Sequence, residues 1–297
     1  MSKVSIKEFS RPWTRGATLK DFLERLPEIL AGEEIREVIS AVARAYLKNK
    51  IVLFGMGAHV IKVGLSPLVV DLMERGVVSA VAMNGAGIIH DAEIAMAGKT
   101  SEDVGSNLGK GRFGMSRETV DFLNKAIRKA ERRTCGLGQA VGEAIIENKL
   151  PFQQFSILAA GVRLKIPVTV HVAFGTDILH IHPGFDPRST GKATHLDFRL
   201  FASVVAALEA GVYFNVGSAV ILPEVFLKAL TLVRNLGHTV RSFTTVNMDF
   251  MKHYRPLTNV VTRPTVDGGK GYSLIGHHEL MLPLIAAGVI EAIEPSI

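Results

Sequence analysis

The sequence has almost no cysteine, no long uninterrupted apolar run and no secretory signal. Cys135 is the single cysteine among 297 residues, so an internal disulfide is excluded and the composition is typical of a reducing compartment. Charges or glycines interrupt every apolar run before it reaches the length that spans a bilayer, and the first residues are polar. We therefore expect a cytoplasmic protein with no membrane segment.

Several sequence motifs of nucleotide and metal sites are also absent. No third glycine follows Gly55-Met56-Gly57 at the dinucleotide spacing, and no GxxxxGK[ST], HExxH or CxxC occurs. The formal net charge of +6 would permit anionic partners. The basic residues are scattered, however, and no nucleic-acid motif accompanies them. We expect no nucleic-acid partner.

Apolar residues are abundant, and their pattern predicts an α/β fold. The chain is 47% hydrophobic and 21% charged, with a mean hydropathy of +0.26. We interpret this excess as buried parallel strands. We predict a single α/β domain over residues 1–297. Its N-terminal arm and helices would occupy residues 1–49, and a Rossmann-like core residues 50–290.

The core is most clearly outlined over residues 51–98. A short apolar run at 51–54 ends in a glycine turn, a helical pattern follows, and a second apolar run at 77–83 ends in Asn84-Gly85-Ala86-Gly87. Further strands are expected at 168–174, 211–216 and 240–247, a long loop at 99–115, and irregular chain at 248–272. The pattern predicts a doubly wound, mostly parallel sheet with N-terminal helices.

Polar residues gather where the predicted strands end, and ligands of such sheets bind at the carboxyl ends of the strands. One interpretation is a dinucleotide site. Another is a zinc site that uses His180 and His182 with a further His or Asp. A third is that the histidines only cap strands or bond to the backbone. Lys270, in a glycine-rich loop, could be an imine-forming nucleophile or an ordinary loop lysine.

The order of motifs resembles the deoxyhypusine synthase family over roughly residues 50–290. The stretches that carry the likeness are FGMGAHVIKVGLSP, NGAGIIHD, AFGTDILHIHP, NVGSAVILPEVFLKA, TTVN and GHHELMLP. The resemblance implies a Rossmann-like fold that binds NAD, in a homotetramer with active sites between subunits. It also implies cofactor contacts at Gly57, Ala58, His59, Asn84, Gly85, Ala86, Asp177, Gly217, Ser218, Thr245, Val246, His277 and His278.

The resemblance places catalytic candidates at His90 and its neighbour Asp91, at Glu224 and at Lys270, and we expect His90, Asp177 or His180 to move the proton. The Trp-Gly-Lys motif that carries the family's imine-forming lysine is missing, and histidines stand where acids hold a polyamine. We therefore expect an NAD-dependent enzyme that acts on a C–N bond of another amine or amino acid, and not deoxyhypusine synthesis. The alternatives are a metal-dependent hydrolase and a non-catalytic NAD-binding protein.

Overall fold

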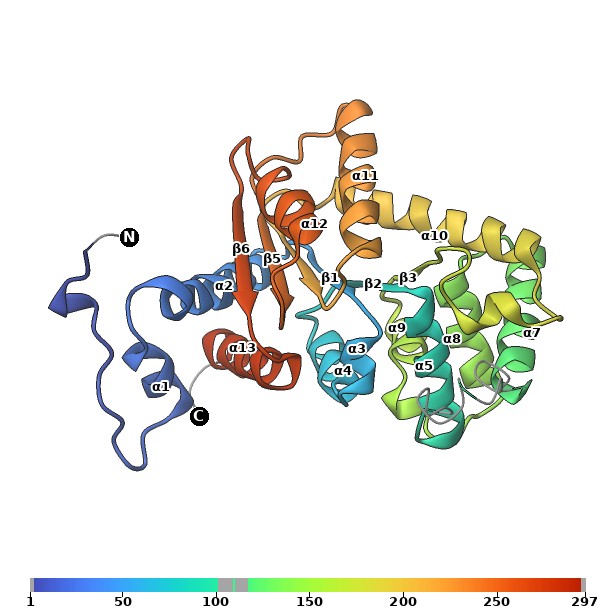
Figure 1. Ribbon diagram of the computed structural model, residues 1–297, viewed down its shortest axis with the longest axis horizontal. Helices are drawn as coiled ribbons and strands as arrows, with labels where there is room; N and C mark the ends of the chain where they lie inside the picture. Colours follow the sequence, from blue (N-terminus) through green and yellow to red (C-terminus); the bar gives the residue numbers. More distant parts are fainter. Residues whose placement is uncertain (1–2, 101–108, 110–116, 295–297) are drawn as a thin grey trace.

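The computed structural model describes residues 3–100, 109 and 117–294. Its strands form one six-stranded parallel sheet in the order β3-β2-β1-β4-β5-β6 (Figure 1). The strands are β1 (Val52–Met56), β2 (Ala80–Asn84), β3 (Val168–His171), β4 (Val212–Val216), β5 (Thr244–Asp249) and β6 (Lys270–Ile275). This is the strand order of a doubly wound dinucleotide-binding sheet. The predicted Rossmann-like α/β fold is confirmed.

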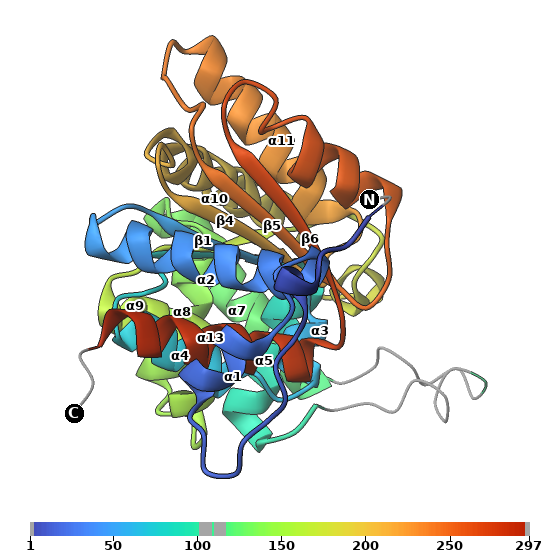
Figure 2. The same ribbon diagram turned by 90° about the vertical axis from the view of Figure 1, so that its left-hand side faces the viewer.

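Helices cover both faces of the sheet, because successive side chains of each buried strand point to opposite sides. Leu53 and Tyr213 pack with Phe226 in a cluster formed with two helices, α10 (Pro187–Ala206) and α11 (Ile221–Asn235). Phe54 and Met56 belong to the cluster on the other face. Figures 1 and 2 show these two helix layers on either side of the strands. The second layer contains α2 (Leu30–Leu47), α3 (His59–Lys62), α4 (Ser66–Glu74), α5 (Gly85–Ala97), α7 (Arg117–Arg133), α8 (Leu137–Glu147), α9 (Ile157–Leu164) and α13 (His278–Ile293).

The remaining elements are short. A 3-10 turn, η1 (Ile6–Glu8), and helix α1 (Leu19–Arg25) precede the core. Near the sheet lie η2 (Gln153–Phe155), η3 (Ile178–Ile181), α12 (Tyr254–Pro256) and the π-helical turn η4 (Leu257–Thr262). No helix in residues 3–100 and 117–294 is both long and apolar enough to cross a membrane.

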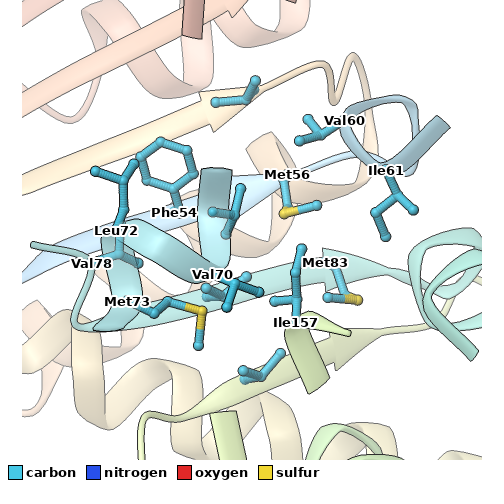
Figure 3. Packing of buried hydrophobic residues seen from close by; sticks show 14 of the residues in the cluster. Phe54, Met56, Val60, Ile61, Val70, Leu72, Met73, Val78, Met83 and Ile157 are labelled. Carbon is cyan, nitrogen blue, oxygen red and sulfur yellow. The ribbon is translucent and has the colours of Figure 1, made fainter. Parts of the chain in front are cut away.

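Tight packing holds the first glycine turn in place. Val60 and Ile61 of the short helix α3 are 0% and 3% exposed, and they lie close to Met56 and Met83 (Figure 3). Close-packed interiors leave little room for movement. The apolar contacts of Val60 and Ile61 therefore hold the turn at residues 57–59 in place.

Some sequence-based expectations differ from the structure, and strand β3 ends at His171 and not at the predicted residue 174. Helix α10 begins at Pro187, because Asp186 caps it by accepting a hydrogen bond from the Ser189 N–H. Strand β5 begins and ends later than predicted, at Thr244 and Asp249. Strand β6 was missed altogether. It lies at the edge of the sheet and buries only two of its six side chains, so its apolar pattern is weak. The predicted 99–115 loop lies almost entirely outside the described residues.

Candidate functional site

The sheet changes winding direction between β1 and β4, and two glycine turns meet at that point. From β1 the chain continues to β2 on one side, and from β4 to β5 on the other. A Cβ on Gly57 would lie 2.1 Å from the Gly217 carbonyl oxygen. The Gly57 N–H donates to Val216 O at 2.9 Å, and the Gly217 N–H to Met248 O at 3.0 Å. Sheets of this kind bind ligands in a crevice at the switch point, and here the bare backbone of the two glycine turns would form its floor.

His278 closes one side of the crevice. Gly217 has a φ of +64°, and a Cβ there would lie 2.8 Å from the His278 ring. Because a carbonyl only accepts, the 3.2 Å contact with Met248 O assigns the His278 proton to Nε2. Nδ1 is then an acceptor, and it is buried with no partner among the described residues. Burial lowers the pKa of His278, which favours the neutral ring.

Aromatic and imidazole rings surround His278. The His59 ring lies 5.3 Å from it and the Phe250 ring 6.4 Å, measured between centroids. The His277 and Phe250 rings are nearly parallel, at 7°, with centroids 6.5 Å apart. The structure thus brings the predicted His59, His277 and His278 together, and it adds Phe250, which the sequence interpretation left in irregular chain.

The ends of β2 and β3 form the second part of the site. Asn84 caps α5 by accepting the Gly87 N–H at 3.0 Å, and a Cβ on Gly85 would lie 2.0 Å from Asp177 Oδ2. The Asp177 carboxyl group therefore packs directly on the α5 N-terminus. Its Oδ2 is buried without a partner in the described chain. Burial raises the Asp177 pKa, while the charges of His180 and His90 lower it.

His90 is held by a buried carboxylate. Its Nδ1 lies 3.0 Å from Oε2 of Glu93, which is 3% exposed, while the His90 side chain is 22% exposed. Donation from Nδ1 to the carboxylate leaves Nε2 as the basic nitrogen. A histidine oriented in this way can act as a general acid or base through Nε2. Glu93 was missed from the sequence, although its spacing of three residues from His90 on one helix face signals the contact.

His180 and His182 are engaged with the backbone. His180 Nδ1 accepts the N–H groups of Gly175 at 3.2 Å and Asp177 at 3.1 Å, and His182 Nδ1 accepts the Gly184 N–H at 3.1 Å. Because its basic nitrogen is occupied, His180 positions the Asp177 loop and is poorly placed to accept a proton. Within the described ranges, no three His, Cys, Asp or Glu side chains gather as metal ligands would. The zinc alternative is not supported.

Asp91 does not face the crevice. It is 1% exposed, and it accepts hydrogen bonds from Ser156 Oγ at 2.5 Å and from the N–H groups of Ile157 at 2.8 Å and Leu158 at 3.3 Å. This is a cap on the N-terminus of α9. Burial raises the Asp91 pKa to about 6. The carboxylate therefore has a structural role, which corrects the catalytic assignment.

Lys270 lies at the amino ends of the strands, whereas the glycine turns lie at the carboxyl ends. It is the first residue of β6, whereas the glycine turns follow the last residues of their strands. Its Nζ pairs with Glu37 Oε1 at 3.1 Å. A lysine there cannot reach a substrate bound at the carboxyl ends of the strands, so its assignment as covalent acceptor is corrected.

Three further candidates lie away from the crevice floor. Thr245 and Val246 are fully buried within β5, which runs on to Asp249, so neither is at the strand end. Glu224, in the first turn of α11, accepts from Arg255 and Asn259, each at 2.9 Å. It joins α11 to the segment after β5. Ser218 remains at the β4 end, where its Oγ accepts the Leu222 N–H at 3.2 Å.

No family model and no curated protein matches the sequence, but solved structures share the fold. A candidate deoxyhypusine synthase from Entamoeba histolytica has a TM-score of 0.54 at 12% identity, over 95% of this chain and 96% of that one. A candidate LOR/SDH protein from Methanococcus maripaludis S2 has a TM-score of 0.53 at 12% identity, over 93% of this chain and 71% of that one.

A third neighbour is the ternary complex of AgrE with ornithine and NAD+. Its TM-score is 0.55 at 16% identity, over 86% of this chain but only 32% of AgrE, so this chain spans about a third of that protein. Likeness at such identities concerns the fold. The chain therefore has the Rossmann-like fold shared by deoxyhypusine synthase-like and LOR/SDH-like proteins.

Proposed function

We propose that this protein is an NAD-dependent enzyme that acts on a C–N bond of an amine or amino-acid substrate. The observation that carries the proposal is the backbone contact between Gly57 and Gly217 at the switch point. A site without side chains on its floor lets a dinucleotide approach the main chain closely. The AgrE complex, which contains NAD+ and ornithine, supports the same ligand classes for this fold.

The residues at the switch point fit such a cofactor. Gly57, Ala58 and Gly217 would line the floor, and the unpartnered Nδ1 of His278 would accept a hydrogen bond from it. A buried acceptor that lacks a partner costs about 1–3 kcal/mol, so a donor on a bound ligand would be stabilising. When bound, NAD would supply the hydride acceptor.

The neighbouring strand end fits the substrate. Asp177 Oδ2 is a buried acceptor that needs a donor, and an ammonium group would supply both the hydrogen bond and an opposite charge. Such a cation would lower the Asp177 pKa and keep the carboxylate ionised. This extends the role of Asp177 beyond the cofactor contact implied by the resemblance.

Proton transfer is then assigned to His90. His90 lies on α5, whose N-terminus the Asp177 carboxyl group contacts, and its side chain is partly exposed. Glu93 holds Nδ1 and stabilises the imidazolium that forms when Nε2 takes a proton from the substrate. Because Lys270 lies at the amino ends of the strands, the proposal includes no imine between a lysine and the substrate.

The test combines binding and turnover on the full chain. Calorimetry should give micromolar affinity for NAD in the wild type and in His90→Ala. NADH formation over a panel of amines and amino acids should fall by about 10²–10⁴ in His90→Ala, and in the same direction in Glu93→Gln. The matched control is His238→Ala, because His238 is an exposed histidine outside the site.

Two outcomes would overturn the proposal. Failure of the wild type to bind NAD would remove the cofactor, and full turnover by His90→Ala would remove the assigned acid–base residue. NAD binding with no turnover on any substrate would instead support the non-catalytic alternative. The single domain, the homotetramer and the cytoplasmic location stay predictions.

A further inference from the structure

The second half of the sheet repeats the arrangement of the first, with one chemical difference. In the first half, β1 leads through Gly57 to β2, which ends in Asn84. In the second, β4 leads through Gly217 and α11 to β5, which ends in Asp249. In nucleotide-binding sheets, an acid at the end of the strand after the glycine turn binds the ribose hydroxyls. Asn84 cannot do this, because its Oδ1 already caps α5.

Asp249 is 4% exposed, and within the described part of the chain its Oδ2, unlike Asn84 Oδ1, accepts no hydrogen bond. Its Oδ1 accepts the Phe250 N–H at 2.8 Å. The His253 Nε2 atom lies 4.0 Å from Oδ2, which is beyond hydrogen-bond distance. Asp249 directly follows Met248, whose carbonyl oxygen accepts the Gly217 N–H at 3.0 Å and lies 3.2 Å from His278 Nε2, so Asp249 is next to the switch point.

A flat binding surface adjoins this carboxylate. Phe250 is 49% exposed and the His277 side chain 69% exposed. Their rings are parallel to within 7°, with centroids 6.5 Å apart. Exposed, nearly parallel rings present faces on which a planar base can stack. Stacking on aromatic side chains is sequence-tolerant and contributes strongly to binding of nucleic-acid bases.

We propose that Asp249 binds the adenosine ribose of the dinucleotide and makes the site specific for NAD over NADP, with the adenine held by Phe250 and His277. A carboxylate accepts hydrogen bonds from both ribose hydroxyls and repels a 2′-phosphate. The adenosine half then lies on β4–β6. The nicotinamide half points toward β2, three strand spacings or about 14 Å from β5, where His90 and Asp177 are found. This inference rests on the proposed function.

The experiment is a calorimetric titration of the full chain with NAD, NADP and ADP-ribose. Wild type should bind NAD at least about tenfold more tightly than NADP. Asp249→Asn keeps an acceptor for the Phe250 N–H but removes the charge. The substitution should weaken the binding of NAD and ADP-ribose by about tenfold, the equivalent of one charged hydrogen bond. It should also bring the ratio of NAD affinity to NADP affinity close to one.

Two further variants separate recognition from folding. Asp267→Asn removes one exposed carboxylate from the turn before β6, at the amino ends of the strands. It should change neither the affinity for NAD nor the ratio of NAD affinity to NADP affinity. Phe250→Ala should weaken NAD, NADP and ADP-ribose alike by about tenfold, with no change in their ratio. Thermal unfolding checks that each variant is folded.

The possible failures are distinguishable. If wild type binds neither dinucleotide nor ADP-ribose, the proposed function itself fails. If wild type binds NAD but Asp249→Asn leaves the NAD to NADP ratio unchanged, the proposed function stands and the role of Asp249 is overturned. Tighter binding of NADP than of NAD by the wild type would also overturn it.

Discussion

Replacing Gly57 with alanine tests the backbone contact on which the cofactor site depends. The added Cβ would lie 2.1 Å from the Gly217 carbonyl oxygen, whereas ordinary contacts begin at 3.4 Å. The two turns must therefore separate by about 1.3 Å. Gly217 cannot easily retreat, because its N–H is bonded to Met248 O and its Cα faces the His278 ring.

The expected effect follows from this displacement. Overpacking of this kind costs about 1–3 kcal/mol, so the free energy of unfolding in urea should fall by that amount. The same movement should misplace the crevice floor and weaken NAD binding about tenfold or more in calorimetry, since both turns line the site. Shape changes at a preorganised site act on affinity as well as on stability.

Gly191→Ala is the matched control. Gly191 lies inside α10, where an added Cβ meets only the Phe174 ring, at an ordinary 3.8 Å. Alanine in a helix interior is favoured over glycine by about 0.5–1 kcal/mol. The same chemical change should therefore stabilise the protein and leave NAD affinity unaltered. Unchanged stability and affinity in Gly57→Ala would refute the close-approach reasoning.

Three further perturbations have defined outcomes. Asp91→Ala leaves the α9 N-terminus without its cap and should lower the free energy of unfolding by about 2–4 kcal/mol in urea; a change below 1 kcal/mol would contradict the capping role. Burial raises the Asp197 pKa to about 7, so the native state holds a proton that the unfolded state has lost above about pH 4. Stability should therefore fall as pH rises from 5 to 7.5, by at most about 1.4 kcal/mol per pH unit for this group, and Asp197→Asn should flatten the profile; an equal slope in both proteins would count against it. Lys270→Ala removes a surface ion pair with Glu37 and should change stability by less than about 1 kcal/mol with no loss of turnover, whereas an inactive variant would restore the lysine mechanism.

Local pattern predicted the central strands well and the edge strand poorly. β1 and β4 are apolar at almost every position because both of their faces are covered, and such runs stand out in any sequence. β6 is covered less and has only Tyr272 and Leu274 as buried side chains. Its hydrogen bonds to β5 make it a strand, and those depend on a neighbour that is distant in sequence.

The candidate site, too, could be predicted only in part from the sequence. The glycine turns and the histidines after them could be predicted, because the carboxyl ends of parallel strands share one edge. Asp91 and Lys270 were misassigned because residue type does not reveal direction. Asp91 neighbours His90 in sequence but points to the α9 N-terminus, and Lys270 sits at the wrong end of its strand.

Hydrophobic periodicity and glycine position are local properties, so the class of fold and the edge of the sheet that would bind a ligand could be predicted from the residues alone. Which polar groups already have hydrogen-bond partners could not be predicted in this way. Asp91 is fully bonded, whereas Asp177 Oδ2 and His278 Nδ1 are buried without a partner in the described chain. That distinction depends on contacts between elements far apart in sequence, and it separates structural side chains from those available to a ligand.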